Sequence, residues 1–417
     1  MSAVTVEKKT YAAESFLKAD GSLDTESEGE LNVVFIGGSL TEAVGTNAGE
    51  KKWTQSVADY LGELFPNKKV NHINSGVGGT NSEGAAARFC EHVAPYEPDI
   101  IFIDFTVNDD MNNFDEARAQ YRLENFLYQC SQLEKIPTVV YLHTPPATLP
   151  NSAVYNEWYE QVEYKEEWAA HYGISTINIY NYSYAKFEKE KAEGGESDYI
   201  KWLDTYYGTL QDEEVGVNSK YGRYDVHGGY QLYLEAIIAA FESSAEEILT
   251  PYRFASYLHP EKIDEIERTY LKYSHTDEIF DYSDGWKVYQ KSDVEQRTTG
   301  DLRIPLARWE YPFLIDGVHE AAEGESVTLT TNADSITLYY MAVASPSGGN
   351  FEVYVGEKLI ATLKGHSSSI QPFFSNTVEL NNDEHEELTV TIKVAHGQAT
   401  AETAYVRFTS VYFGYNQ

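Results

Sequence analysis

Cysteine is scarce in this sequence, and clusters of basic residues are missing from it. The two cysteines, Cys90 and Cys130, lie in helix-like stretches with neither disulfide nor metal-ligand spacing, so we expect two buried, reduced thiols. Lys and Arg number 31 against 66 Asp and Glu, which gives a formal net charge of −35. Nucleic acids and anionic membranes bind clustered positive charge, so the sequence predicts neither as a partner.

Long apolar runs are missing as well. No run approaches the roughly 18 apolar residues that a membrane-spanning helix needs, and the N-terminus lacks the apolar core of a signal peptide. We therefore expect a cytoplasmic protein, although a signal peptide removed beforehand would leave the same pattern. The residues present are 42% hydrophobic and 14% aromatic, as in folded proteins, and 417 residues exceed one ordinary core. Two domains are expected.

The first half of the sequence alternates between buried strands and amphipathic helices. Short apolar runs that end at glycine or polar residues predict strands, and apolar residues at helical spacing predict helices. The predicted strands are 31–37, 70–74, 99–107, 138–143 and 175–179, and the predicted helices are 53–65, 84–93, 114–133, 154–171 and 230–249. This order indicates an α/β fold, with a parallel sheet covered by helices on both faces.

From about residue 285 the pattern changes to alternation of apolar and polar residues. Short strands of this kind, separated by Gly, Asn, Asp and Ser, indicate an antiparallel β-sandwich. A further helix is predicted at 260–274. We therefore expect an α/β domain over residues 1–250, a helical linker over 251–284 and a sandwich over 285–417.

Four polar or glycine-rich segments follow the predicted strands. Ser39 follows the first strand after two glycines, a loop containing Gly79 follows the second, Asn108 follows the third, and His143 begins the loop after the fourth. Because ligands bind beyond the carboxyl ends of parallel strands, we expect these loops to converge. A serine nucleophile needs a base and fixed oxyanion donors, and His227, before the helix at 230–249, is a candidate base.

Each segment also has an ordinary structural interpretation: a turn, a flexible glycine loop, a strand cap and a histidine at a helix start. Other chemistries fit less well. The glycine loop lacks the full dinucleotide and phosphate-loop patterns, and the serine segment lacks the final glycine of the α/β-hydrolase elbow. His385-Glu386 is not followed by a second histidine at helical spacing, and we predict neither a metal site nor a cofactor.

Taken together, the segments resemble the four sequence blocks of the SGNH, or GDSL-like, hydrolase superfamily. Ser39 matches the first block in its Gly-Gly-Ser-Leu-Thr form, Gly79 lies five residues after Asn74 as in the glycine block, and Asn108 matches the asparagine block. The resemblance implies a flavodoxin-like three-layer fold. It implies Ser39 as nucleophile, His227 as base, and an oxyanion hole formed by the N–H groups of Ser39 and Gly79 and the side chain of Asn108.

The last block departs from the family pattern. The family places an aspartate three residues before the histidine, but Tyr224 stands there and Asp225 follows one residue later, while Gly228 replaces the usual proline. Three explanations are open: Asp225 serves from a shifted loop, a backbone carbonyl orients His227, or another histidine, with His259 as the candidate, is the base. We assign His227 and Asp225 to the catalytic group.

The Gly-Gly-Ser form with a sandwich downstream is similar to bacterial carbohydrate acetyl esterases. That similarity implies a jelly-roll sandwich like a carbohydrate-binding module, and an acetylated oligosaccharide of mannan or xylan type as substrate. The alternatives are a lipid or thioester hydrolase of the same superfamily, or a non-catalytic carbohydrate-binding protein on a decayed hydrolase fold. The substrate-binding residues and the oligomeric state are left open.

Two groups of aromatic residues either stack on sugar rings or pack inside the protein. One alternates along a predicted strand of the sandwich, and the other lies in the long connection between residues 150 and 225. The members are Trp309, Tyr311 and Phe313 in the first group, and Trp158, Trp168, Trp202, Tyr206 and Tyr207 in the second.

Overall fold

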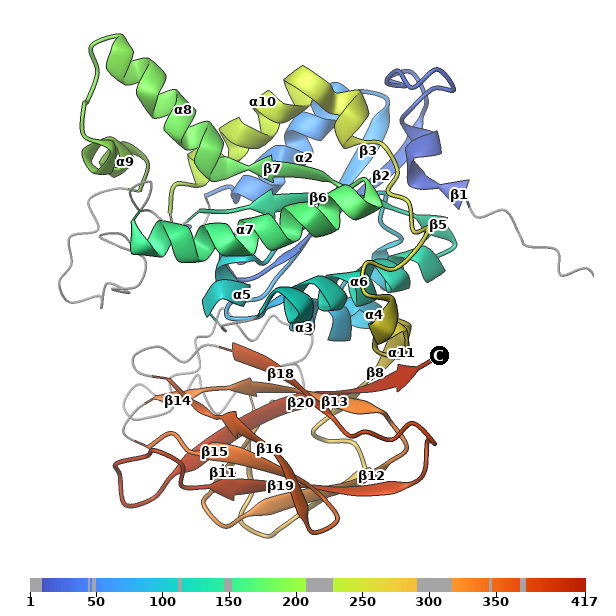
Figure 1. The fold of residues 1–417 in the computed structure, drawn as a ribbon, viewed down its shortest axis with the longest axis vertical. Helices are drawn as coiled ribbons and strands as arrows, with labels where there is room; N and C mark the ends of the chain where they lie inside the picture. The colour runs from blue at the N-terminus through green and yellow to red at the C-terminus, as the bar shows by residue number, and fades with distance from the viewer. Residues whose placement is uncertain are drawn as a thin grey trace, which may run out of the picture. The chain divides into compact units, whose positions relative to one another are not determined.

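The chain divides into two compact units. The computed structural model describes residues 10–43, 46, 50–111, 115–145, 152–207, 228–290, 317–344, 347–367 and 373–417. One unit comprises Met1–Ser82 and His92–Ile266, and the other comprises Glu83–Glu91 and Glu267–Gln417. Figure 1 shows the elements of both.

The first unit is built on a parallel sheet of five strands. Its spatial order is β3 (Lys68–Gly76), β2 (Gly29–Gly37), β4 (Ile100–Asp104), β6 (Thr138–His143) and β7 (Ser175–Asn178). Counted along the chain this is the order 2-1-3-4-5 of flavodoxin-like folds. The predicted α/β fold is confirmed. A short parallel pair, β1 (Thr10–Tyr11) with β5 (Lys135–Ile136), lies outside this sheet.

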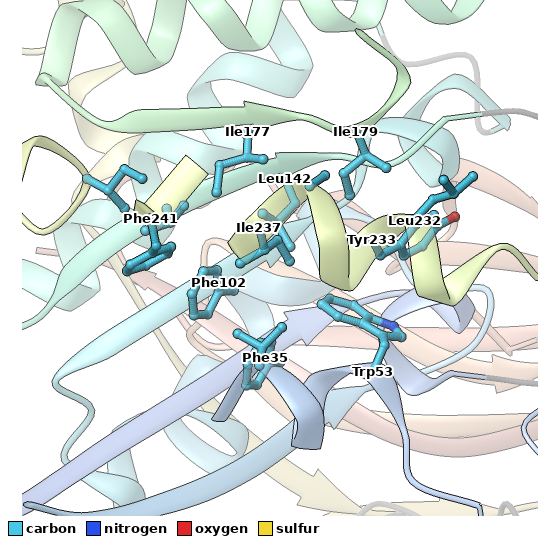
Figure 2. Close-up of a cluster of buried hydrophobic side chains, with 14 of the residues drawn as sticks. Phe35, Trp53, Phe102, Leu142, Ile177, Ile179, Leu232, Tyr233, Ile237 and Phe241 are labelled. Carbon is cyan, nitrogen blue, oxygen red and sulfur yellow. The ribbon is translucent and has the colours of Figure 1, made fainter. Parts of the chain in front are cut away.

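Helices cover both faces of this sheet, as Figure 1 shows. Residues 31, 33 and 35 of β2 belong to a core shared with two helices on one face, while residues 34 and 36 are buried on the other. In Figure 2, Phe35 and Phe102 of the sheet lie against Trp53 and Phe241. The helices of the first face are α2 (Trp53–Leu64) and α10 (Tyr230–Ile248), and those of the second are α6 (Glu116–Gln132) and α7 (Ala153–Tyr172).

Two further helices lie in the long connection, where only one helix and one strand were predicted. They are α8 (Ile179–Ala192) and α9 (Tyr199–Tyr207). Tyr180 and Phe187 of α8 and Trp202 of α9 join the core of the first face. The apolar side chains of α8 are spread around the helix, so it has no clear stripe in the sequence.

The second unit is an antiparallel sandwich of two sheets with one apolar core, as predicted. One sheet has the order β10-β11-β20-β13-β18, with β8 also paired to β20, and the other β16-β15-β19-β12-β9. The first sheet contains β8 (Arg268–Ser274), β10 (Lys287–Tyr289), β11 (Val318–Ala322), β13 (Ser335–Met341), β18 (Phe373–Glu379) and β20 (Tyr405–Asn416). The second contains β9 (Phe280–Tyr282), β12 (Ser326–Thr331), β15 (Asn350–Val355), β16 (Lys358–Lys364) and β19 (Leu388–Ala395), and β14 (Val343–Ala344) pairs separately with β17 (His366–Ser367).

The predicted helical linker is wrong in its second part. Helical turns occupy only η4 (Pro260–Lys262) and α11 (Ile263–Ile266), after which β8 pairs with β20 inside the sandwich. The compact units therefore divide at Ile266, rather than at the predicted boundaries 250 and 285.

A short internal segment, Glu83–Glu91, also belongs to the sandwich unit. The predicted helix at 84–93 is split there into α3 (Ser82–Ala87) and α4 (Phe89–His92). The Tyr339 hydroxyl donates to the Gly84 carbonyl (2.8 Å), and the Tyr412 hydroxyl donates to the Glu91 carboxylate (2.6 Å). The same carboxylate pairs with Lys272 (2.8 Å). These contacts tie the segment to the sandwich strands.

The two cysteines differ in exposure. Cys130 is buried in α6 as predicted, whereas Cys90 in α4 is exposed, contrary to the prediction. Among the residues that the structure describes, no helix is both long and apolar enough to cross a bilayer.

Candidate active site

Three strand ends meet at the carboxyl edge of the parallel sheet. In the register of the sheet, Gly37 at the end of β2 lies beside Gly76 of β3 on one side and Asp104 of β4 on the other. The segments that carry Ser39, Gly79 and Asn108 therefore leave the sheet side by side, which was the expectation drawn from the sequence.

Ser39 is the first residue of a four-residue helix, α1 (Ser39–Glu42). It is partly exposed, whereas the next two residues, Leu40 and Thr41, are buried. The Trp53 indole N–H donates to the Leu40 carbonyl at 2.9 Å and holds the turn against α2. Ser39 is thus open to solvent, while the backbone that follows it is held by the buried residues Leu40 and Thr41 and by the Trp53 hydrogen bond.

The two glycines before Ser39 are required by close contacts. A Cβ on Gly37 would lie 2.0 Å from the Thr41 hydroxyl oxygen, and a Cβ on Gly38 would lie 2.1 Å from Oδ1 of Asn108. Neither position has room for a side chain. The second contact places the Asn108 carboxamide directly against the residue that precedes Ser39.

Asn108 lies in a helix and not at a strand end. The strand predicted to reach residue 107 ends at Asp104, and α5 (Thr106–Met111) begins two residues later. Asn108 is 7% exposed. Asn108 lies in the first turn of α5 and does not cap β4. In this position its side chain faces Gly38.

The loop that carries Gly79 is hydrogen-bonded to the Ser39 segment. The Val77 N–H donates to the Gly37 carbonyl (3.0 Å), and the Gly78 N–H donates to the Glu42 carboxylate (2.8 Å). Gly79 itself has a φ of +86°, a conformation that favours glycine. The loop is therefore held beside α1, and the predicted oxyanion residue has a backbone conformation that suits glycine.

Asn74, the residue that sets the spacing to Gly79, fastens the start of this loop. Its Nδ2 donates to the Thr41 carbonyl (2.9 Å) and to the Thr54 hydroxyl (3.0 Å), while its Oδ1 accepts from the Gly76 N–H (2.9 Å). One carboxamide thus links the end of β3 to α1 and α2.

Asp104 is a buried carboxyl group beneath α1. It accepts hydrogen bonds from the hydroxyls of Thr144 (2.6 Å) and Thr41 (3.3 Å). Burial raises its pKa to about 7, although both hydroxyls favour the ionised form. The sequence analysis did not single out this residue, because an aspartate at the end of an apolar strand carries no distinctive pattern.

His143 ends β6 at the same edge but is engaged in the interior. Its Nδ1 lies 3.2 Å from the Thr106 hydroxyl, its Nε2 lies 3.1 Å from the Glu166 carboxylate, and the side chain is fully buried. Burial lowers the pKa of His143 despite the nearby glutamate. Both ring nitrogens therefore have partners other than Ser39.

His227 and Asp225 lie outside the described residues, and their catalytic assignment stays a prediction. The two glycines that follow are described. Gly228 has a φ of +153° and Gly229 a φ of +62°, and a Cβ on either would lie within 2.8 Å of the Tyr207 ring. Proline, with φ near −65°, does not fit the backbone conformation of Gly228.

His259, the alternative base, contacts two other side chains through its ring nitrogens. Its Nε2 lies 2.7 Å from the Gln120 side-chain oxygen, and its Nδ1 lies 3.3 Å from the Glu261 carboxylate. An imidazole held by two side chains at a helical turn is not presented to Ser39. The structure therefore argues against this alternative.

The aromatic residues of the long connection pack in the interior. Trp158 and Trp168 are fully buried, Trp202 and Tyr207 are nearly so, and Tyr206 is half-buried. The packing interpretation is confirmed for the first four. Residues 309, 311 and 313 lie outside the described part of the chain, so the choice between sugar stacking and interior packing stays open for the sandwich.

Comparisons with known proteins agree with this fold. No curated protein matches the chain. Two crystal structures of a two-domain esterase active on acetylated mannans, one co-crystallized with mannopentaose, each match with a TM-score of 0.63 and 17% identity over 94% of this chain and 93% of theirs. The model of the GDSL-like lipase/acylhydrolase family matches residues 35–200. The predicted resemblance to the GDSL-like hydrolases is therefore confirmed over this part of the chain, which contains Ser39, Gly79 and Asn108.

Proposed function

We propose that this protein is a carbohydrate O-acetyl esterase that acts through a serine acyl-enzyme. The observation that carries the proposal is the contact between Gly38 and the Asn108 carboxamide, because it brings a partly exposed serine and a side-chain amide donor to one point of the sheet edge. The glycine loop is hydrogen-bonded to the same segment. A nucleophile beside converging donors is the arrangement that acyl transfer needs.

The proposed reaction has two halves. The Ser39 hydroxyl attacks the acetyl carbonyl while His227 accepts its proton, and the resulting oxyanion is bound by the N–H groups of Ser39 and Gly79 and the Asn108 amide. The sugar alcohol then leaves with the proton from His227. Water attacks the acetyl-serine in the same way, and acetate leaves with Ser39 regenerated. Asp225 or a backbone carbonyl orients His227.

Two features support a neutral acetylated oligosaccharide as the substrate. The two-domain esterase that shares this fold is active on acetylated mannans. A net charge of −35 disfavours phosphorylated or otherwise anionic substrates but imposes no such penalty on an acetylated sugar. Mannan and xylan oligosaccharides are both within this class.

The test is acetate release from acetylated manno- and xylo-oligosaccharides, together with p-nitrophenyl acetate hydrolysis. Ser39→Ala should abolish turnover and the acetyl-enzyme seen by mass spectrometry, with an unchanged thermal transition. Ser56→Ala is the matched control, since this serine lies partly exposed in α2 and its hydroxyl makes a long hydrogen bond to the Lys52 carbonyl (3.5 Å). Sugar binding without Ser39-dependent turnover would instead support a non-catalytic carbohydrate-binding protein.

A further inference from the structure

A buried ion pair lies next to the two segments that carry the predicted oxyanion donors. Asp109 follows Asn108 in α5, and its carboxylate lies 3.1 Å from the Lys165 ammonium of α7. Both side chains are fully buried. The ammonium also donates to the Gln161 side-chain oxygen (3.0 Å).

The other oxygen of Asp109 reaches the glycine loop. Its Oδ1 accepts a hydrogen bond from the Ser82 N–H at 2.9 Å. Ser82 comes three residues after Gly79, and residues 80–82 are all buried. A single carboxylate therefore connects the end of the Gly79 loop to the turn that carries Asn108.

Burial and the neighbouring ammonium act in opposite directions on this carboxylate. Burial raises the pKa of Asp109, and the Lys165 ammonium is the main influence in the opposite direction. A buried ion pair generally contributes little net stability compared with neutral groups of similar size. A gain in stability therefore does not explain this ion pair well. A role in fixing the distance between the two predicted oxyanion donors, Gly79 and Asn108, explains it better.

We propose that Asp109 is a positioning residue, which sets the Gly79 loop relative to Asn108 through its bond to Ser82, and that Lys165 is its compensating cation. This inference rests on the proposed esterase function. Oxyanion donors act only when their directions are fixed before the reaction. Loss of the Asp109 link should therefore lower kcat while leaving KM nearly unchanged, because ground-state binding does not depend on the oxyanion donors.

The test compares two double variants in which no charge is left buried alone. Asp109→Asn with Lys165→Gln keeps an acceptor for the Ser82 N–H, and Asp109→Ala with Lys165→Gln removes it. We expect the first to keep kcat for p-nitrophenyl acetate within about threefold of wild type, and the second to lose about 10- to 100-fold, part of the effect of one oxyanion donor. KM should stay within about twofold in both.

Leu61→Ala is the control for destabilisation, since Leu61 is fully buried in α2 and its loss lowers stability without touching the pair. Its kcat should be unchanged below its melting transition. Equal kcat in wild type and the Asp109→Ala double variant would overturn the positioning role while Ser39-dependent turnover kept the proposed function standing. If wild type shows no Ser39-dependent turnover, the proposed function and this inference both fail.

Discussion

Replacing Gly38 with alanine tests the contact on which the proposed function depends. The new Cβ would lie 2.1 Å from Oδ1 and 2.7 Å from Cγ of Asn108, far inside van der Waals contact, so the carboxamide must move away. Loss of one oxyanion donor costs about 10²- to 10³-fold in kcat, or about 3 to 4 kcal/mol of transition-state stabilisation. We expect Gly38→Ala to show a loss of this size, with KM nearly unchanged.

A double-mutant cycle separates displacement of Asn108 from any other effect of the methyl group. Asn108→Ala should lower kcat by the same factor, and adding Gly38→Ala to it should change kcat little, since the atoms that would clash are then gone. The assay is p-nitrophenyl acetate hydrolysis at several substrate concentrations. Gly62→Ala is the control, because the nearest atom to a Cβ there is 3.6 Å away. Full activity in Gly38→Ala, or additive losses in the double variant, would refute the reasoning.

Three further outcomes are expected. The pKa of Asp104 is raised from 3.8 to about 7, so its contribution to stability is present below about pH 4 and is lost as the pH rises through about 7. The melting temperature of Asp104→Asn minus that of wild type should therefore increase between pH 5 and pH 8. A difference that stays constant over this range would contradict the pKa shift. A chain ending at Ile266 lacks the sandwich strands that hold Glu83–Glu91, so it should show no cooperative melting transition by circular dichroism, and a native-like transition would show that the segment folds without them. His227→Ala should lower kcat by about 10³-fold or more. His259→Ala should keep kcat and lower the free energy of unfolding by about 1 kcal/mol, because it removes the contact with Gln120. The reverse result would make His259 the base.

The elements set by local pattern were predicted well. The strand at 138–143 has the predicted ends, because an apolar run is bounded at each side by residues that do not continue it. The three segments after the first three strands were expected to converge, and the sheet register places them side by side. Parallel topology follows from strand and helix order alone, so this part of the candidate site was accessible from the sequence.

Features that depend on distant partners were not predicted. Arg268–Ser274 is a strand because β20, near the end of the chain, pairs with it, and no local signal reports that pairing. Lys165 lies among charged residues of an amphipathic helix, where a lysine is normally solvated, and only the fold reveals that it is buried against Asp109. Asn108 was placed at a strand end because the apolar run continues to Val107, past the last paired residue.

The two buried aspartates beneath the candidate site are neutralised in different ways. The Lys165 ammonium beside Asp109 lowers its pKa against the effect of burial, whereas Asp104 accepts hydrogen bonds from the hydroxyls of Thr41 and Thr144 and has a pKa raised to about 7. For the proposed reaction this matters, because a bare carboxylate in a low-dielectric interior would oppose an oxyanion forming at Ser39, two residues from Thr41. In a chain of net charge −35, pairing one carboxylate and discouraging ionisation of the other limits the negative charge at the place where a negative charge must form.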